Sequence, residues 1–80
     1  MTDAIDGALT VGVVGCGYWG SKHVRVLQTL NGVGKVVAVD RSQDILDQIS
    51  AIHPHVDTER SFERAIGYLD AVIIATPPLT

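Results

Sequence analysis

The stretch Leu9-Thr-Val-Gly-Val-Val-Gly-Cys-Gly-Tyr-Trp-Gly20 decides the fold class. Its valines predict a strand buried on both faces, because such strands are almost continuously apolar. The glycines that follow have the spacing G-x-G-x-x-G, and they stand where the predicted strand gives way to a helix. This arrangement is typical of the phosphate-binding turn of a βαβ unit that holds a dinucleotide.

The glycines of this turn have separate expected roles. Gly15 can adopt the backbone angles of a sharp turn, and Gly17 lacks the Cβ that would keep the main chain away from a pyrophosphate. Gly20 would let the new helix lie close against the first strand. The unpaired N–H groups around Gly17, Tyr18 and Trp19, together with the positive end of the helix dipole, would favour a phosphate without a basic side chain.

Asp40 directly follows a second apolar run, residues 35–39, and lies about twenty residues after Gly20. This is the separation expected for the acid that holds an adenosine ribose, and its charge would repel the 2′-phosphate of NADP. We therefore expect NAD as the cofactor. Arg41 keeps NADP open, because a guanidinium beside the ribose can pair with a 2′-phosphate. In the alternative interpretation the glycines only make a tight connection, and Asp40 caps the following helix.

Apolar strands alternate with helical segments along the chain, which predicts a parallel, doubly wound α/β sheet with strand order 3-2-1-4, a partial Rossmann fold. Leu30 should lie on the buried face of the first helix, which Asn31-Gly32 should end. Ser42 should cap the second helix, and His53-Pro54 should stop it. The predicted strands cover residues 9–14, 35–39, 55–58 and 70–75, and the predicted helices cover residues 18–30, 42–52 and 61–66.

The fourth predicted strand, residues 70–75, reads as fully buried, yet it would form a flat apolar edge of this sheet. A complete dinucleotide fold adds further strands beyond such an edge. We therefore expect residues 1–80 to be the N-terminal portion of a dinucleotide-binding domain, truncated before the remaining strands and a C-terminal substrate domain. The isolated chain should then associate or aggregate.

Composition limits the possible partners. The chain is 46% hydrophobic and carries a formal net charge of −3, so it is globular in type and gives no electrostatic reason to bind nucleic acid or an anionic membrane. Acids stand near the N-terminus where a secretory signal would be basic, and no apolar run approaches membrane-spanning length. A cytoplasmic location is expected.

The remaining candidate groups favour structural roles. Cys16 is the single cysteine, which excludes an internal disulfide. We interpret Cys16 as a small side chain that fills space and not as a reactive thiol. His53 and His55 have no neighbouring ligand-type residues in sequence, so we read them as a solvated turn and expect no metal.

Three motifs resemble the glucose-fructose oxidoreductase, inositol dehydrogenase and rhizopine-catabolism (Gfo/Idh/MocA) family: residues 11–20, the Val-Ala-Val-Asp of residues 37–40, and the Asp-Ala-Val-Ile-Ile-Ala-Thr-Pro of residues 70–77. The resemblance covers nearly the whole chain. It implies that Asp40 and Arg41 contact the adenosine end of the cofactor. It also implies that Thr76 and Pro77 contact the ribose on the nicotinamide side, and that the pyrophosphate meets Gly15, Gly17, Tyr18 and Trp19, with Gly20 in the same turn.

The resemblance further implies hydride transfer between a nicotinamide cofactor and a hydroxyl of a sugar, cyclitol or nucleotide sugar, in a homo-oligomeric enzyme. The catalytic lysine and histidine of that family would follow Thr80, so this chain is expected to hold the coenzyme and to contain no catalytic residue. One alternative is a regulatory module that senses NAD(H) without chemistry. A methyltransferase is a more distant alternative, since it also holds an adenosine ribose with an acid but needs no pyrophosphate turn.

Overall fold

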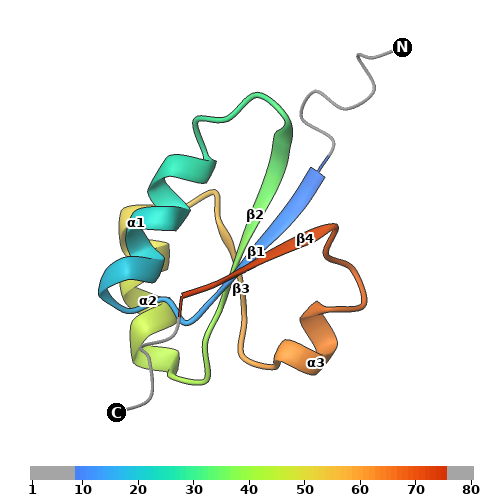
Figure 1. Ribbon diagram of the computed structural model, residues 1–80. Coiled ribbons are helices and arrows are strands. Elements are labelled where there is room, and N and C mark those ends of the chain that lie inside the picture. The colour runs from blue at the N-terminus through green and yellow to red at the C-terminus, as the bar shows by residue number, and fades with distance from the viewer. Residues whose placement is uncertain (1–8, 76–80) are drawn as a thin grey trace.

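The computed structural model describes residues 9–75, apart from the side chains of Tyr18 and Trp19. Neighbouring strands all pair in parallel, in the order β3-β2-β1-β4 (Figure 1). The expected α/β class and the strand order 3-2-1-4 are therefore confirmed for this part of the chain. The elements are β1 (Leu9–Val14), α1 (Tyr18–Leu27), β2 (Val33–Val39), α2 (Gln43–Ile52), β3 (Asp57–Glu59), α3 (Phe62–Ala65) and β4 (Ala71–Ile74).

The helices divide between the two faces of the sheet (Figure 1). The chain moves outward from β1 to β2 to β3, and right-handed crossovers place α1 and α2 on one face. It then returns past β1 to reach β4, so the same handedness places α3 on the opposite face. The strand order thus reverses between β1 and β4.

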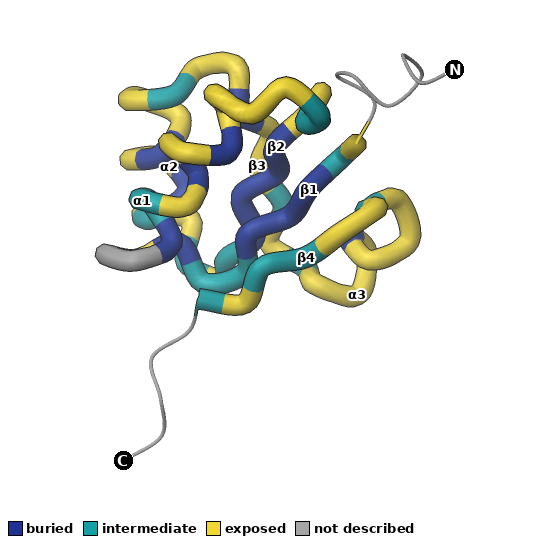
Figure 2. Tube along the Cα trace, turned by 45° about the horizontal axis from the view of Figure 1, so that its top comes forward, coloured by how far each residue is buried: buried dark blue, intermediate teal, exposed yellow. Residues whose placement is uncertain are grey.

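The larger core lies between α1, α2 and the sheet. Leu46 of α2 is 1% exposed, and Val13 of β1 and Val24 of α1 are completely buried. Figure 2 shows this core as the dark segments of β1, β2 and the two helices that face them. Its buried members are Val11, Val13, Cys16, Val24, Leu27, Val36, Ala38, Leu46, Ile49 and Val56.

The opposite face has a much smaller core. Val37, Val39 and Ala65 are buried there, and Val14 and Leu69 pack against them. The helix on this face has only four residues and cannot cover the sheet.

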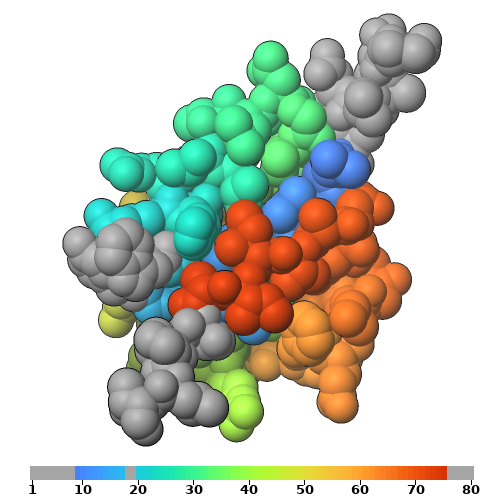
Figure 3. Space-filling model, viewed as in Figure 1, coloured from blue at the N-terminus to red at the C-terminus, as the bar shows by residue number. Residues whose placement is uncertain are grey.

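No residue of β4 is buried, so the expectation of a fully buried fourth strand is wrong. Among residues 9–75 the strand has a partner, β1, on one side only, and the short α3 leaves Ile74 65% exposed. Figure 3 shows the atoms of this C-terminal strand, in red, lying open on the surface beside the blue of β1. The strand is also shorter than predicted, spanning Ala71–Ile74.

Helix α2 follows its sequence signals. The Ser42 hydroxyl accepts a hydrogen bond from the N–H of Ile45 at 3.3 Å, and the helix ends at Ile52, with His53 as its C-cap. Both predictions for this helix are confirmed. Neither α1 nor α2 exceeds ten residues, and within residues 9–75 no helix is long and apolar enough to cross a membrane.

Helix α1 ends at Leu27, one turn before the predicted end. The N–H groups of Thr29 and Leu30 donate to the carbonyls of Val26 and Leu27, which makes a tight turn. Leu30 consequently lies outside the helix and is 48% exposed, so its predicted place on the buried face is wrong. Gly32 does not end the helix, and among the described glycines only Gly15 has a positive φ.

Two strands differ from their predicted bounds. Strand β2 begins at Val33, two residues early, because Val33 already pairs with Leu9 of β1. Strand β3 spans Asp57–Glu59 in place of residues 55–58, and the buried Val56 packs into the core just before it.

Candidate functional site

A sharp turn joins the end of β1 to the start of α1. Gly15 has a φ of 87°, a conformation that favours glycine, and its N–H donates to the Val39 carbonyl at 2.9 Å. The turn is therefore fixed to the end of β2. This confirms the conformational role predicted for Gly15.

Gly20 is required by the packing of the turn. A Cβ at this position would overlap the carbonyl oxygen of Gly15 and lie 2.8 Å from its carbon. Because the obstacle is backbone, no side-chain movement could relieve it. Close approach of the helix to the preceding segment is thus confirmed as the reason for glycine at this position.

Gly17 differs from Gly20 in having open space around it. Its φ is −73° and its ψ is −142°, and a Cβ built on it would meet nothing within 4 Å. The space beside Gly17 is therefore open. A ligand that must approach the backbone closely is a physical reason for glycine here.

The first turn of α1 is suited to an anion. Gly17 is the N-cap and supplies no side-chain cap, and the first turn contains no acidic residue. The first N–H groups of a helix have no partners within the helix, and the helix dipole adds partial positive charge there. An anionic group would satisfy these N–H groups from outside.

Asp40 lies beside this turn at the carboxyl end of β2. Its Oδ2 accepts a hydrogen bond from the N–H of Cys16, and its Oδ1 accepts one from the N–H of Ser42, each at 2.9 Å. The fold thus brings the predicted acid and the predicted turn together across 24 residues of sequence. A carboxylate has about four acceptor positions, so capacity for two ligand hydroxyls is left.

The alternative interpretation of Asp40 as the cap of the next helix is wrong. The side chain that caps α2 is Ser42, whose hydroxyl accepts from Ile45. Asp40 instead holds the N–H of Ser42, one residue before the helix begins.

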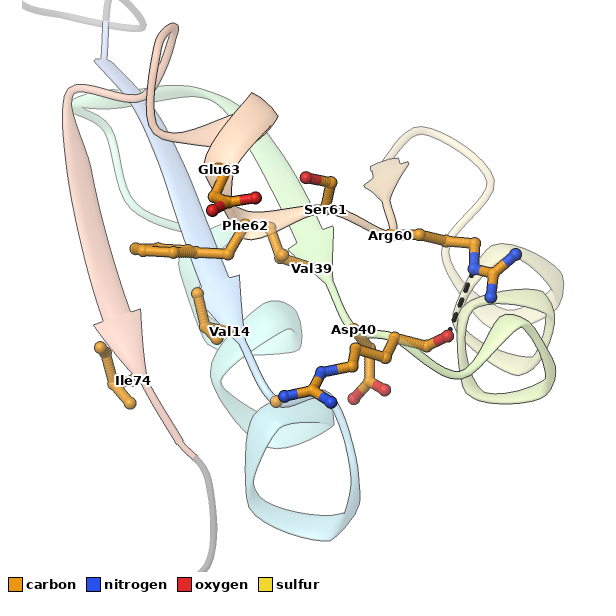
Figure 4. Close-up of a pocket in the computed structure, with 10 residues that line it drawn as sticks. Val14, Val39, Asp40, Arg60, Ser61, Phe62, Glu63 and Ile74 are labelled. Carbon is orange, nitrogen blue, oxygen red and sulfur yellow. Dashed lines mark hydrogen bonds between the residues drawn. The ribbon is translucent and has the colours of Figure 1, made fainter.

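A cleft of about 720 Å³ opens beside Asp40 (Figure 4). Val14, Val39 and Phe62 give it an apolar wall, while Asp40 and Arg60 lie at its polar side. Arg60 is held there because its Nε donates to the Arg41 carbonyl at 3.2 Å. The full lining is Val14, Gly15, Val39, Asp40, Arg41, Arg60, Ser61, Phe62, Glu63 and Ile74.

Seven of these residues were not predicted as site residues, and four of the seven are the consecutive residues Arg60–Glu63. They follow β3, and the carboxyl ends of parallel strands meet at one edge of the sheet. From the predicted strand order alone, these residues could therefore have been predicted to lie near Asp40.

Cys16 is a structural residue. Its side chain is 2% exposed, and its Sγ lies 3.2 Å from the Val13 carbonyl oxygen and 3.8 Å from that of Val39. Burial raises the pKa of the Cys16 thiol to about 11; the backbone hydrogen bond to Val39 opposes this rise and the Asp40 charge adds to it. The thiol is therefore protonated at neutral pH, which agrees with its interpretation as a filler side chain.

His53 connects two helices. Its Nδ1 lies 2.9 Å from Nε2 of Gln28, just beyond the end of α1. Within residues 9–75 no three or more His, Cys, Asp and Glu side chains come together as a possible metal site.

Several predicted contacts fall outside what the structure describes. Thr76 and Pro77 lie beyond residues 9–75, and of Tyr18 and Trp19 only the backbone is described, in the first turn of α1. Arg41 is exposed and lines the cleft.

No protein-family model matches the chain, and no curated protein matches it either.

Proposed function

We propose that this chain binds NAD as the N-terminal part of a Rossmann domain in an oxidoreductase. The parallel sheet in the order β3-β2-β1-β4 supports the proposal, because ligands of doubly wound sheets bind at the carboxyl ends of the strands where the order reverses. The turn after β1 lies at this point.

Gly17 is the observation that carries the proposal. The space that a Cβ would occupy at this position is open, and a pyrophosphate bound to the N–H groups of the turn would need that space. The uncapped start of α1 supplies those N–H groups.

Asp40 would hold the adenosine ribose through the acceptor capacity left on its carboxylate. Its negative charge beside the 2′-position favours NAD over NADP. The apolar wall beside it, with Val39 and Phe62, suits the adenine ring, and Arg41 lines the same cleft.

The proposed substrate is a hydroxyl of a sugar, cyclitol or nucleotide sugar. This part rests on the resemblance of residues 11–20, 37–40 and 70–77 to the Gfo/Idh/MocA family. When bound, the nicotinamide would accept or supply the hydride, and the residues described here would hold and orient the cofactor.

Calorimetric titration with NAD tests the proposal through two matched glycine variants. Gly17→Ala should keep the fold but weaken NAD binding at least about tenfold, because the new methyl group lies where the pyrophosphate would approach. Gly67→Ala is the control, since its Cβ would make only an ordinary 3.6 Å contact with the Arg64 carbonyl oxygen, away from the turn. It should leave NAD binding unchanged.

Titrations of the unaltered protein with other ligands complete the test. NADP should bind more weakly than NAD, and adenosine more weakly again because it lacks the pyrophosphate. Tighter binding of S-adenosylmethionine than of NAD would contradict the proposal, as would equal NAD affinity in Gly17→Ala and Gly67→Ala.

A further inference from the structure

We propose that Asp40 is also a positioning residue for the phosphate turn, so that one carboxylate both recognises the ribose and sets the turn that holds the pyrophosphate. This inference rests on the proposed function. It adds a second task for Asp40, carried out through the backbone of Cys16 and not through contact with the phosphate.

The hydrogen bonds of the carboxylate hold it from two sides. Oδ2 accepts from the N–H of Cys16 in the turn, and Oδ1 accepts from the N–H of Ser42 before α2. The N–H of Asp40 itself donates to the Glu59 carbonyl at the end of β3, at 3.1 Å. Rotation of the carboxylate would therefore break at least one bond, and the side chain acts as a fixed acceptor for the turn.

Cys16 is the central residue of the turn between β1 and α1. It lies between Gly15, which has the positive φ, and Gly17, the N-cap of α1. Its N–H donates to Asp40, so this N–H group is already used, and the space beside the next residue, Gly17, is open. Releasing Cys16 from Asp40 would let the peptide unit between Gly15 and Cys16 rotate and would misalign the N–H groups that follow it.

The two possible effects of Asp40 on a phosphate have opposite signs. As a negative charge near the turn, the carboxylate repels an anion, so neutralising it should tighten anion binding. As the acceptor that orients Cys16, it prepares the turn, so removing it should weaken anion binding. A ligand that has phosphates and no ribose separates these effects.

The test uses inorganic pyrophosphate and the Asp40→Asn variant. Asparagine has the same shape, but its single oxygen can replace only one of the two acceptors, and its NH₂ group would face the other backbone N–H. Pyrophosphate affinity, measured directly by calorimetric titration, should fall about tenfold in Asp40→Asn. Asp44→Asn, which loses the same charge from the exposed first turn of α2, should bind pyrophosphate as well as the unaltered protein or slightly better.

Each outcome has a distinct meaning. Unchanged or tighter pyrophosphate binding in Asp40→Asn would overturn the positioning role and leave the proposed NAD site intact. Failure of the unaltered protein to bind pyrophosphate at all would overturn both. If Asp40→Asn does not fold, amide hydrogen exchange of the unaltered protein decides: the Cys16 N–H should exchange at least about tenfold more slowly than in an unstructured chain, and unprotected exchange would overturn the proposal.

Discussion

The two faces of the sheet differ in how completely they are packed. On one face, α1 and α2, with ten residues each, bury ten residues of a continuous core. On the other, the four-residue α3 helps to bury only Val37, Val39 and Ala65 and leaves Phe62 and Ile74 exposed.

Because of this difference, one face of the sheet supports the turn after β1 and the other face leaves the cleft beside Asp40 open. The turn after β1 is held from the packed face, where Cys16 and Val13 belong to the larger core. The cleft beside Asp40 opens on the thin face, where Val14, Phe62 and Ile74 line it. A rigid core behind the turn and open space in front of it are what a preorganised binding site needs.

The largest expected effect comes from the packed face. Leu46→Ala should lower the free energy of unfolding by about 2–5 kcal/mol, because it removes a fully buried side chain and leaves a cavity. Ile52→Ala in the same helix is the control, and since Ile52 is 69% exposed the change should be within about 0.5 kcal/mol. Urea denaturation measures both, and equal losses would contradict the assignment of the core to this face.

A smaller effect should appear at high pH, through Cys16. Its pKa is raised from 9.0 to about 11 in the folded protein, so folding favours the protonated thiol. This stabilisation is fully present below pH 9 and is lost as the pH rises through 11, by about 3 kcal/mol in total. Urea denaturation between pH 7 and pH 11 should show the loss, and Cys16→Ala should lack this part of it. The same alkaline slope in both proteins would rule out Cys16 as the cause.

The smallest effect is expected on the thin face. Ile74→Thr keeps a β-branched residue in β4 and should change the free energy of unfolding by less than about 0.5 kcal/mol, because Ile74 is mostly exposed. A loss above about 1 kcal/mol in the same urea experiment would mean that this face is covered in solution, and the contrast between the faces would then be weaker than described.

The features that could be predicted from sequence depend on local signals. Helix α2 begins after Ser42 and ends before His53, because the hydroxyl cap and the proline that follows act within a few residues. The strand order followed from alternating elements and the handedness of their connections. Gly15 and Gly20 were predictable because glycine in a strand-to-helix turn has few physical explanations.

The features that were missed depend on distant contacts. The apolar spacing of α1 continues to Leu30, but the chain turns at Leu27 so that Val33 can pair with Leu9. The hydrogen bond from Cys16 to Asp40 needs a particular side-chain orientation across 24 residues of sequence, which no local pattern specifies. The exposure of β4 depends on what covers it, and not on its own apolar composition.

The attachment of the turn after β1 to β2 affects the order of folding. The N–H groups of Gly15 and Cys16 bond to Val39 and Asp40, so β1 and α1 alone lack the partners that shape the turn. Parallel strands joined by a helix form through non-local contacts, which are slower to establish than a hairpin or an isolated helix. During synthesis on the ribosome, the turn would therefore take its final shape only after Asp40 has left the exit tunnel and β2 has joined β1.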